Sequence, residues 1–167
     1  MAADSDPPAF PVSVKLGAAI VGGTHTDAAV LGFSNCVVVL LTQLASIGSL
    51  VQATVSRVAD GSDYDIEHAM ECLSTTPDLP IDVRFLLGNG AGTAAASLYQ
   101  ILAMDITQRK HRQSPKDARP IILGTALDLP RAYKLPPVAE DADVADASAY
   151  APVLSALAAL AEECRVW

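Results

Sequence analysis

CVVVLLTQ, residues 36–43, is the strongest strand signal in the chain, because it places five apolar residues in a row. Successive side chains of a strand point to opposite faces, so a strand with one solvated face alternates apolar and polar residues. In this stretch one face carries Val37, Val39 and Leu41, and the other carries Val38 and Leu40. We therefore expect the chain's own helices to cover one face and a second subunit to cover the other, which makes all five side chains candidates for a partner interface.

Apolar runs on both sides of this stretch predict three more strands. They cover residues 12–21 and 27–33 upstream and residues 49–56 downstream. Gly22-Gly23 and Ser34-Asn35 separate the first three strands, and these residue types suit the backbone of tight turns. Such short connections predict that the four strands form an antiparallel meander.

The second half of the chain is expected to alternate strands and helices. Residues 82–88 and 121–127 read as strands. The helix after residue 92 would be capped by Thr93, and it has one apolar stripe, formed by Ala95, Leu98, Ile101, Leu102 and Ile106. The last helix would hold Pro152 in its first turn, and its buried face would comprise Val153, Leu157, Leu160 and Cys164.

The predicted fold class is α+β, with the order ββββ-insert-βαβα. Its six-stranded, mostly antiparallel sheet would carry two main helices packed on one face. A length of 167 residues fits one domain, which we place at residues 12–167. Residues 1–11 read as a flexible tail, and the segments 58–80 and 129–148, both of which contain several Asp and Pro residues, read as surface inserts.

Composition and charge narrow the class of partner. The chain has 11 Lys plus Arg against 19 Asp plus Glu, a net charge of −8, which disfavours nucleic acid and anionic membrane surfaces. No apolar run approaches the roughly 18 residues that span a bilayer, and residues 1–11 lack the pattern of a signal peptide. The three cysteines form no metal or disulfide pattern. We expect free thiols and a cytoplasmic location, with the nucleus also compatible.

No residue pattern predicts catalysis or a metal centre. His25 lies close to Asp27, and His68 and Cys72 are spaced to share a helix face. Neither pair has a third ligand or a nucleophile motif beside it. We therefore expect no catalytic residue, no metal and no enzymatic activity.

The glycine-rich segment Gly88–Gly92 supports an alternative function, a small enzyme that binds a nucleotide or acyl-CoA. A glycine-rich turn before a helix can cradle phosphate with its backbone N–H groups. However, Thr93 stands where the dinucleotide fingerprint requires glycine, and no lysine follows the last glycine as a P-loop requires. We favour a flexible connection that holds no cofactor.

Five of the eleven cations gather near the expected end of the first helix: four lie in a segment predicted to be a polar loop from residue 108 to 116, and the fifth is Arg119. They are either a solvated helix end, where cations favour the helix dipole, or a docking patch for an acidic protein surface. The docking candidates are Arg109, Lys110, Arg112 and Lys116.

Residues 21–51 resemble the proteasome assembly chaperone 3 family. The resemblance is carried by Phe33-Ser34, by the apolar strand at 37–41 and above all by TQLASIGSLV at 42–51. It resumes at Val83–Gly88 and at Ile121–Ala126, and Cys164-Arg165-Val166-Trp167 is similar to the family's own ending. It covers about two-thirds of the chain, whereas the tail, the two inserts and the glycine-rich segment depart from the family.

This resemblance implies a six-stranded sheet with helices on one face and no enzymatic activity. It implies a dimer with a subunit like proteasome assembly chaperone 4, although a homodimer also fits the two-sided strand. Such a pair binds α-subunits of the 20S core particle and promotes correct formation of the α-ring. The basic residues of the expected loop would then be the docking site for an α-subunit.

Overall fold

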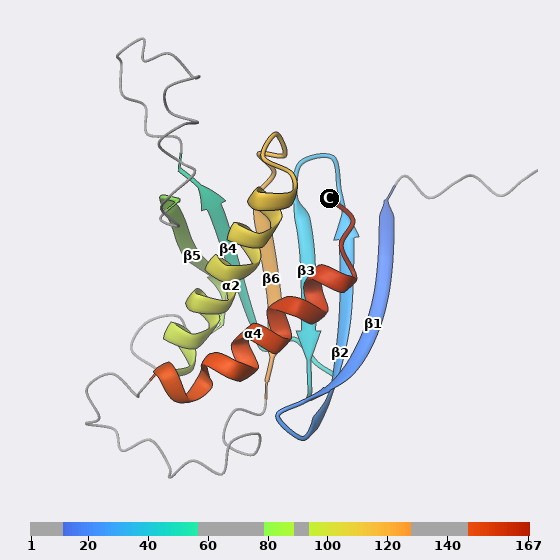
Figure 1. Cartoon of the computed structure of the whole chain (residues 1–167), viewed down its shortest axis with the longest axis vertical. Coiled ribbons are helices and arrows are strands. Elements are labelled where there is room, and N and C mark those ends of the chain that lie inside the picture. Colours follow the sequence, from blue (N-terminus) through green and yellow to red (C-terminus); the bar gives the residue numbers. More distant parts are fainter. Residues whose placement is uncertain (1–11, 57–78, 89–93, 128–146) are drawn as a thin grey trace, which may run out of the picture.

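Six strands and two helices make up the part of the chain that the structure, a computed structural model, describes: residues 12–56, 79–88, 94–127 and 147–167. In chain order they are β1 (Ser13–Val21), β2 (Thr24–Gly32), β3 (Val37–Thr42), β4 (Ser49–Val55), β5 (Ile81–Leu87), α2 (Ala94–Gln113), β6 (Ile121–Ala126) and α4 (Ala147–Glu163). The α+β class and the order of the elements are confirmed, and both helices cross the same face of the sheet (Figure 1).

The strands lie in the order β1-β2-β3-β6-β4-β5. All neighbouring pairs are antiparallel except β3 and β6, which are parallel. The predicted meander is therefore right for the first three strands and wrong for the fourth, because β6 lies between β3 and β4. The reason is burial: Ile121–Ala126 is almost continuously apolar and almost fully buried, so the most stable place for it is the centre of the sheet.

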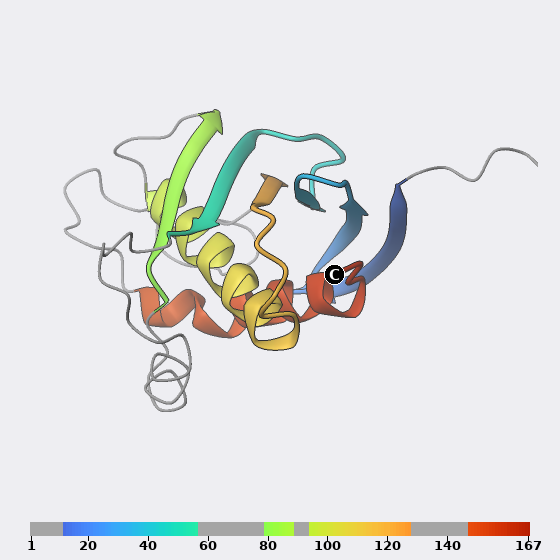
Figure 2. The same ribbon diagram turned by 90° about the horizontal axis from the view of Figure 1, so that it is seen from above.

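One face of the sheet and the inner sides of both helices form the core. Every second residue of the central strands is fully buried there, as the alternation of side chains requires. Figure 2 shows both helices on this side of the sheet. The strand residues of the core include Val30, Val37, Val39, Leu41, Val51, Ala53, Ile121 and Leu123, and the helix residues include Leu98, Leu102, Ile106, Leu154, Leu157 and Leu160.

Three details of the helices differ from the expectation. α2 continues to Gln113, so the basic residues 109–112 belong to its last turns and not to a loop. Ile101 is exposed and does not belong to the buried stripe. Pro152 lies inside α4, beyond its first turn, because that helix begins at Ala147.

The C-terminal segment packs against glycines of the first two strands. Cys164 is buried beside Gly17, where an added Cβ would lie 2.5 Å from the Cys164 Sγ. An added Cβ at Gly32 would lie 3.0 Å from Val166 Cγ2. The Trp167 indole then donates a hydrogen bond of 3.2 Å to the Gln113 side chain at the end of α2. The ending of the chain therefore joins β1 and β2 to α2.

Several predicted segments lie outside the described residues. They are the tail at 1–11, the insert at 58–80 apart from its last two residues, and the linker at 129–148 apart from the two residues that begin α4. Thr93, the expected helix cap, and residues 89–92 lie outside them as well.

Candidate protein-binding face of the sheet

The face of the sheet that points away from α2 and α4 carries two apolar rows, and we call it the open face. The strand register aligns Val14, Leu31, Val38 and Ile122 in the first row, and Leu16, Ala29, Leu40, Gly124 and Leu50 in the second. Partners in register point to the same side and lie within contact distance. No helix of the described part of the chain lies on this side (Figure 2).

Side chains of the open face are exposed to a degree that is unusual for an apolar surface. On β1, Leu16 is 76% and Ile20 is 68% exposed, and Val38 and Leu40 on β3 are half-buried. The described open-face residues of β3, β6 and β4 include no charged side chain. A contiguous apolar surface with charge only at its margins is typical of a protein-binding site.

Polar residues border the apolar rows on the side of β5. There the Arg84 guanidinium donates hydrogen bonds of 3.3 and 2.9 Å to the Gln52 side-chain oxygen of β4. Such a polar margin around an apolar centre matches the rim of a protein interface.

The structure separates the five candidate interface residues into two sets. Val37, Val39 and Leu41 are fully buried beneath the helices, so they cannot touch a partner. Val38 and Leu40 project from the open face, in register with apolar residues of β2 and β6. The two-sided apolar pattern was visible in the sequence, but the side covered by the helices was not.

A groove of about 380 Å³ lies at one end of the open face. Its lining includes Leu16, Ala29, Leu40, Thr42, Ile47 and Asp27. Gly124 contributes to its shape, because a Cβ there would lie 2.7 Å from Leu40 Cδ2, and so glycine allows Leu40 to lean across β6.

The β3–β4 connection, residues 43–48, forms one wall of this groove, and we call it the wall loop. The Thr42 hydroxyl accepts hydrogen bonds from the backbone N–H groups of Leu44 and Ser46, at 3.2 and 3.3 Å, and donates one of 2.9 Å to the Ser46 carbonyl. Sequence reasoning did not select this loop as a site, although the resemblance rests mainly on residues 42–51. An apolar pair, Leu44 and Ile47, beside Gly48 was the available signal.

Arg109, the first of the four docking candidates, bridges the two helices. Its Nε lies 3.0 Å from Asp105 Oδ1 on α2, and its Nη1 lies 3.1 Å from Glu162 Oε2 on α4. The hydrogen bond that Arg109 donates to Asp105 raises the pKa of Arg109, and the one that it donates to Glu162 raises it further. Asp105 and Glu162 compensate the charge of Arg109, and the ion pair with Glu162 links α2 to α4.

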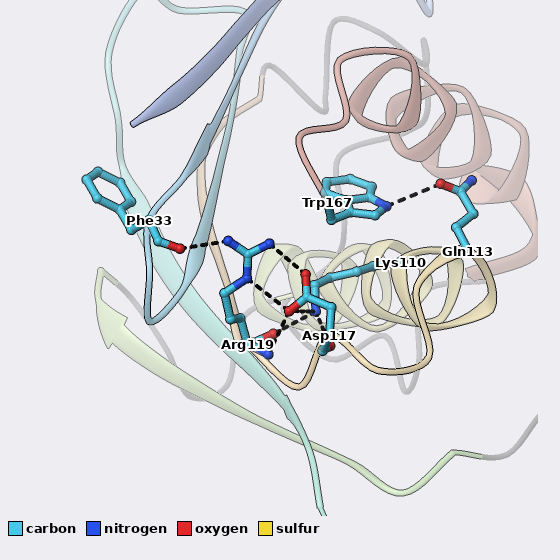
Figure 3. Close-up of polar contacts among 6 residues, drawn as sticks. All are labelled: Phe33, Lys110, Gln113, Asp117, Arg119 and Trp167. Atoms are coloured by element: carbon cyan, nitrogen blue, oxygen red, sulfur yellow. Dashed lines mark hydrogen bonds and ion pairs between the residues drawn. The ribbon is translucent and has the colours of Figure 1, made fainter. Parts of the chain in front are cut away.

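Lys110 is buried, with only 3% of its surface exposed. Its ammonium donates to the carbonyls of Asp117 at 2.6 Å and Arg119 at 2.9 Å, and it lies 3.2 Å from Asp117 Oδ1 (Figure 3). Burial lowers the pKa of Lys110. The docking role expected for Lys110 is therefore corrected: its charge is used inside the molecule and cannot reach a partner.

Asp117 and Arg119 extend this cluster to the sheet. Arg119 pairs with the Asp117 carboxylate at 2.7 Å and donates a 2.7 Å hydrogen bond to the Phe33 carbonyl at the end of β2 (Figure 3). Hydrogen bonds from Arg119, and then from Lys110, hold the pKa of Asp117 well below its usual range. The cluster fixes the segment between α2 and β6.

Of the docking candidates, Arg112 and Lys116 are exposed.

The described residues contain no cluster of side chains that could hold a metal ion. No group of three or more His, Cys, Asp or Glu side chains within them is close enough to hold a metal. The His25 Nδ1 lies 3.7 Å from Asp27 Oδ1, and both side chains are more than half exposed. His68 and Cys72 lie outside the described residues.

Gly88, the first residue of the glycine-rich segment, has a structural role. Its φ is +97°, and an added Cβ would lie 2.8 Å from the Gly48 carbonyl oxygen. Glycine is required by this conformation and by the close approach of the β4 backbone.

Among the described helices, none is long and apolar enough to cross a bilayer.

By its architecture the chain belongs to the α+β class, and both described helices cover the same face of the sheet. No protein-family model matches the sequence, and no curated protein matches it. The structure is similar to a chain in the crystal structure of a novel chaperone complex for yeast 20S proteasome assembly, with a TM-score of 0.50 and 12% sequence identity. The alignment covers 91% of this chain and 99% of the yeast-complex chain. At this identity the similarity shows a shared fold.

Proposed function

We propose that this chain is a non-catalytic chaperone of 20S proteasome assembly that works as a dimer. The observation that carries the proposal is the open face: an apolar sheet surface, charged only at its margins, on a fold shared with a chain of a proteasome-assembly chaperone complex. A surface of this kind is stabilised by a partner that removes it from water.

The proposed partner is a subunit like proteasome assembly chaperone 4. Stacked sheets lie about 10 Å apart, with the inner side chains interdigitating. Val38, Leu40 and Ile122 lie in the middle of the open face and would form the centre of that contact. Five strand spacings of about 4.8 Å make the face roughly 24 Å wide, the scale of an interface that buries about 800 Å² per partner. The alternative to this heterodimer is a homodimer, in which a second copy of this chain occupies the same position.

The dimer would bind α-subunits of the 20S particle and promote correct formation of the α-ring, in the cytoplasm or the nucleus. A partner on the open face would leave the helix layer accessible, because the two lie on opposite sides of the sheet. Arg112 and Lys116, exposed at the end of α2 and in the segment after it, remain the proposed docking cations. A transient contact of this type needs only a modest area and a polar rim.

Reconstitution with purified 20S α-subunits and a chaperone 4-like subunit tests this function. We expect the wild-type chain to form a complex by size-exclusion chromatography with light scattering. Leu40→Asp should abolish it, because a carboxylate would be desolvated at the centre of the contact. Ile101→Asp is the matched control, since Ile101 is an exposed apolar residue of α2 on the other layer. If the wild-type chain forms no complex with either protein, the proposal is wrong.

A further inference from the structure

The wall loop holds apolar side chains in contact with water and one residue in an unfavourable conformation. Leu44 is 54% and Ile47 is 48% exposed. Ala45 has a φ of +52°, a left-handed value that is costly for a residue with a Cβ. Backbone strain of this kind persists only where the surroundings impose it, and it concentrates at sites of function.

Contacts from three strands impose this conformation. Besides the hydrogen bonds of Thr42, the Gln43 side chain donates to the Thr26 hydroxyl of β2 at 2.9 Å and to the Val21 carbonyl of β1 at 3.4 Å. The Gly48 N–H donates to the Thr125 carbonyl of β6 at 3.1 Å. Both ends of the wall loop are therefore fixed to the sheet before any ligand binds, and such preorganisation lowers the entropic cost of binding.

The groove beside the wall loop fits an apolar side chain. Leu16, Leu40 and Ile47 are the large apolar residues of its lining, and Ala29, a small residue between two leucines of the same row, leaves space beside them. A volume of about 380 Å³ lies within the range of roughly 300–1,000 Å³ seen for ligand pockets.

Charge at the groove indicates what flanks that side chain. Asp27 is the one ionisable residue among those that line the groove in the described part of the chain, and its side chain is 60% exposed. A second copy would bring the same Asp27 and the same net charge of −8, which repel. A basic segment of a different protein would be attracted by Asp27 and by the negative net charge of this chain.

We propose that the groove and the wall loop receive one leucine-like side chain of the dimer partner, with an adjacent Lys or Arg that pairs with Asp27. This inference rests on the proposed dimer and names the chemistry of the segment that the partner presents. The partner is a different chain and not a second copy.

Methyl and amide NMR of the whole chain tests the groove directly, with two peptides as probes. We expect Ac-Gly-Lys-Leu-Lys-Gly-NH2 to shift the methyl signals of Leu40 and Ile47, and Ac-Gly-Glu-Leu-Glu-Gly-NH2 to bind about two- to fivefold more weakly, the range of one exposed ion pair. Asp27→Asn should remove this preference, whereas Asp82→Asn, an exposed carboxylate of β5 outside the groove, should retain it. Equal binding of both peptides, or shifts located elsewhere, would overturn the inference.

Filling the groove supplies a second test. Ala29→Phe should abolish the methyl shifts, while Thr54→Phe, on the same face but outside the groove, should leave them unchanged. Asp27→Lys serves if Ala29→Phe does not fold, and it should reverse the order of the two peptides. A stable homodimer that hides Leu40 and Ile47 would also overturn the inference, since a second copy would then be the occupant. These results do not depend on complex formation with α-subunits, so the inference and the proposed function can fail separately.

Discussion

At the scale of single residues, glycines and one partly buried ion cluster decide how the segments fit. Gly17 and Gly32 lie where the C-terminal segment crosses the first two strands, and a side chain at either position would meet Cys164 or Val166. Lys110, Asp117 and Arg119 connect α2, the following segment and β2. Both features depend on residues far apart in the sequence.

Gly17→Ala should destabilise the fold because its new Cβ would lie 2.5 Å from the Cys164 Sγ. Overpacking of this kind costs about 1–3 kcal/mol of unfolding free energy. The same substitution in a Cys164→Ala background should cost much less, because the opposing sulfur is gone. Urea unfolding of the four proteins gives the coupling energy. Equal costs in the two backgrounds would show that the contact is not responsible.

Asp117→Asn should make stability less sensitive to acid. The pKa of Asp117 is depressed by Arg119 and Lys110, so the folded state favours the ionised carboxylate. Its contribution is fully present above the unfolded pKa, about 3.9, and is lost as pH falls from there through the folded pKa. We expect the free energy of unfolding of the wild-type chain to exceed that of the variant by roughly 1.5–3 kcal/mol at pH 7. This difference should shrink toward pH 2.

Urea unfolding at pH 7, 4 and 2.5 measures that difference. Asp82→Asn is the control, because Asp82 is exposed on β5 and surface substitutions usually change stability by less than about 0.5 kcal/mol. A difference between wild type and Asp117→Asn that stays constant with pH would contradict the assigned role of the ion cluster.

At the scale of elements, the connection between β3 and β4 carries more constraint than its length suggests. This connection has to pass the end of β6, because β6 lies between β3 and β4 in the sheet. The wall loop achieves this with hydrogen bonds from Thr42 and Gln43 and with the left-handed Ala45. The cost of that conformation is balanced by contacts to three strands.

Ala45→Val should lower the melting temperature, because a β-branched residue is strongly disfavoured at positive φ. We expect a loss of about 1–2 kcal/mol. Ala45→Gly should differ from wild type by less than about 1 kcal/mol, since relief of strain opposes the added freedom of the unfolded chain. Ala18→Val, on an exposed strand position, is the control for valine itself. Thermal unfolding in which Ala45→Val matches wild type would refute strain at this position.

At the scale of the whole molecule, the sheet separates two surfaces with different properties. The open face is apolar, and the helix layer carries the exposed cations Arg112 and Lys116 on a chain whose net charge is −8. A protein with two such surfaces is able to hold one partner by burial and to orient another by charge.

Arg112→Glu combined with Lys116→Glu should slow association with α-subunits and weaken its dependence on salt, because charge at a rim acts mainly on the association rate. Dimer formation through the open face should be unaffected. Lys15→Glu, an exposed cation of β1, is the control. Stopped-flow association at 50 and 300 mM salt is the measurement, and unchanged rates would remove these two residues from the docking site.

The elements of the chain could be read from its sequence because each depends on neighbours along the chain. The strands, turns and helix face are predicted by local patterns: the unbroken apolar run Val37–Leu41, the turns at Gly22-Gly23 and Ser34-Asn35, and the spacing of Leu98, Leu102 and Ile106. The position of β6, the burial of Lys110 and the wall loop could not be read, because each depends on contacts between distant segments.

Local patterns predict that the third strand is apolar on both sides and that two main helices accompany six strands, and they include no motif that predicts catalysis. The packing of the helices on the sheet then shows that Val37, Val39 and Leu41 face the helices while Val38 and Leu40 face outward. The physical reason is that side-chain alternation is a property of a single strand, whereas coverage of one face depends on where the helices pack.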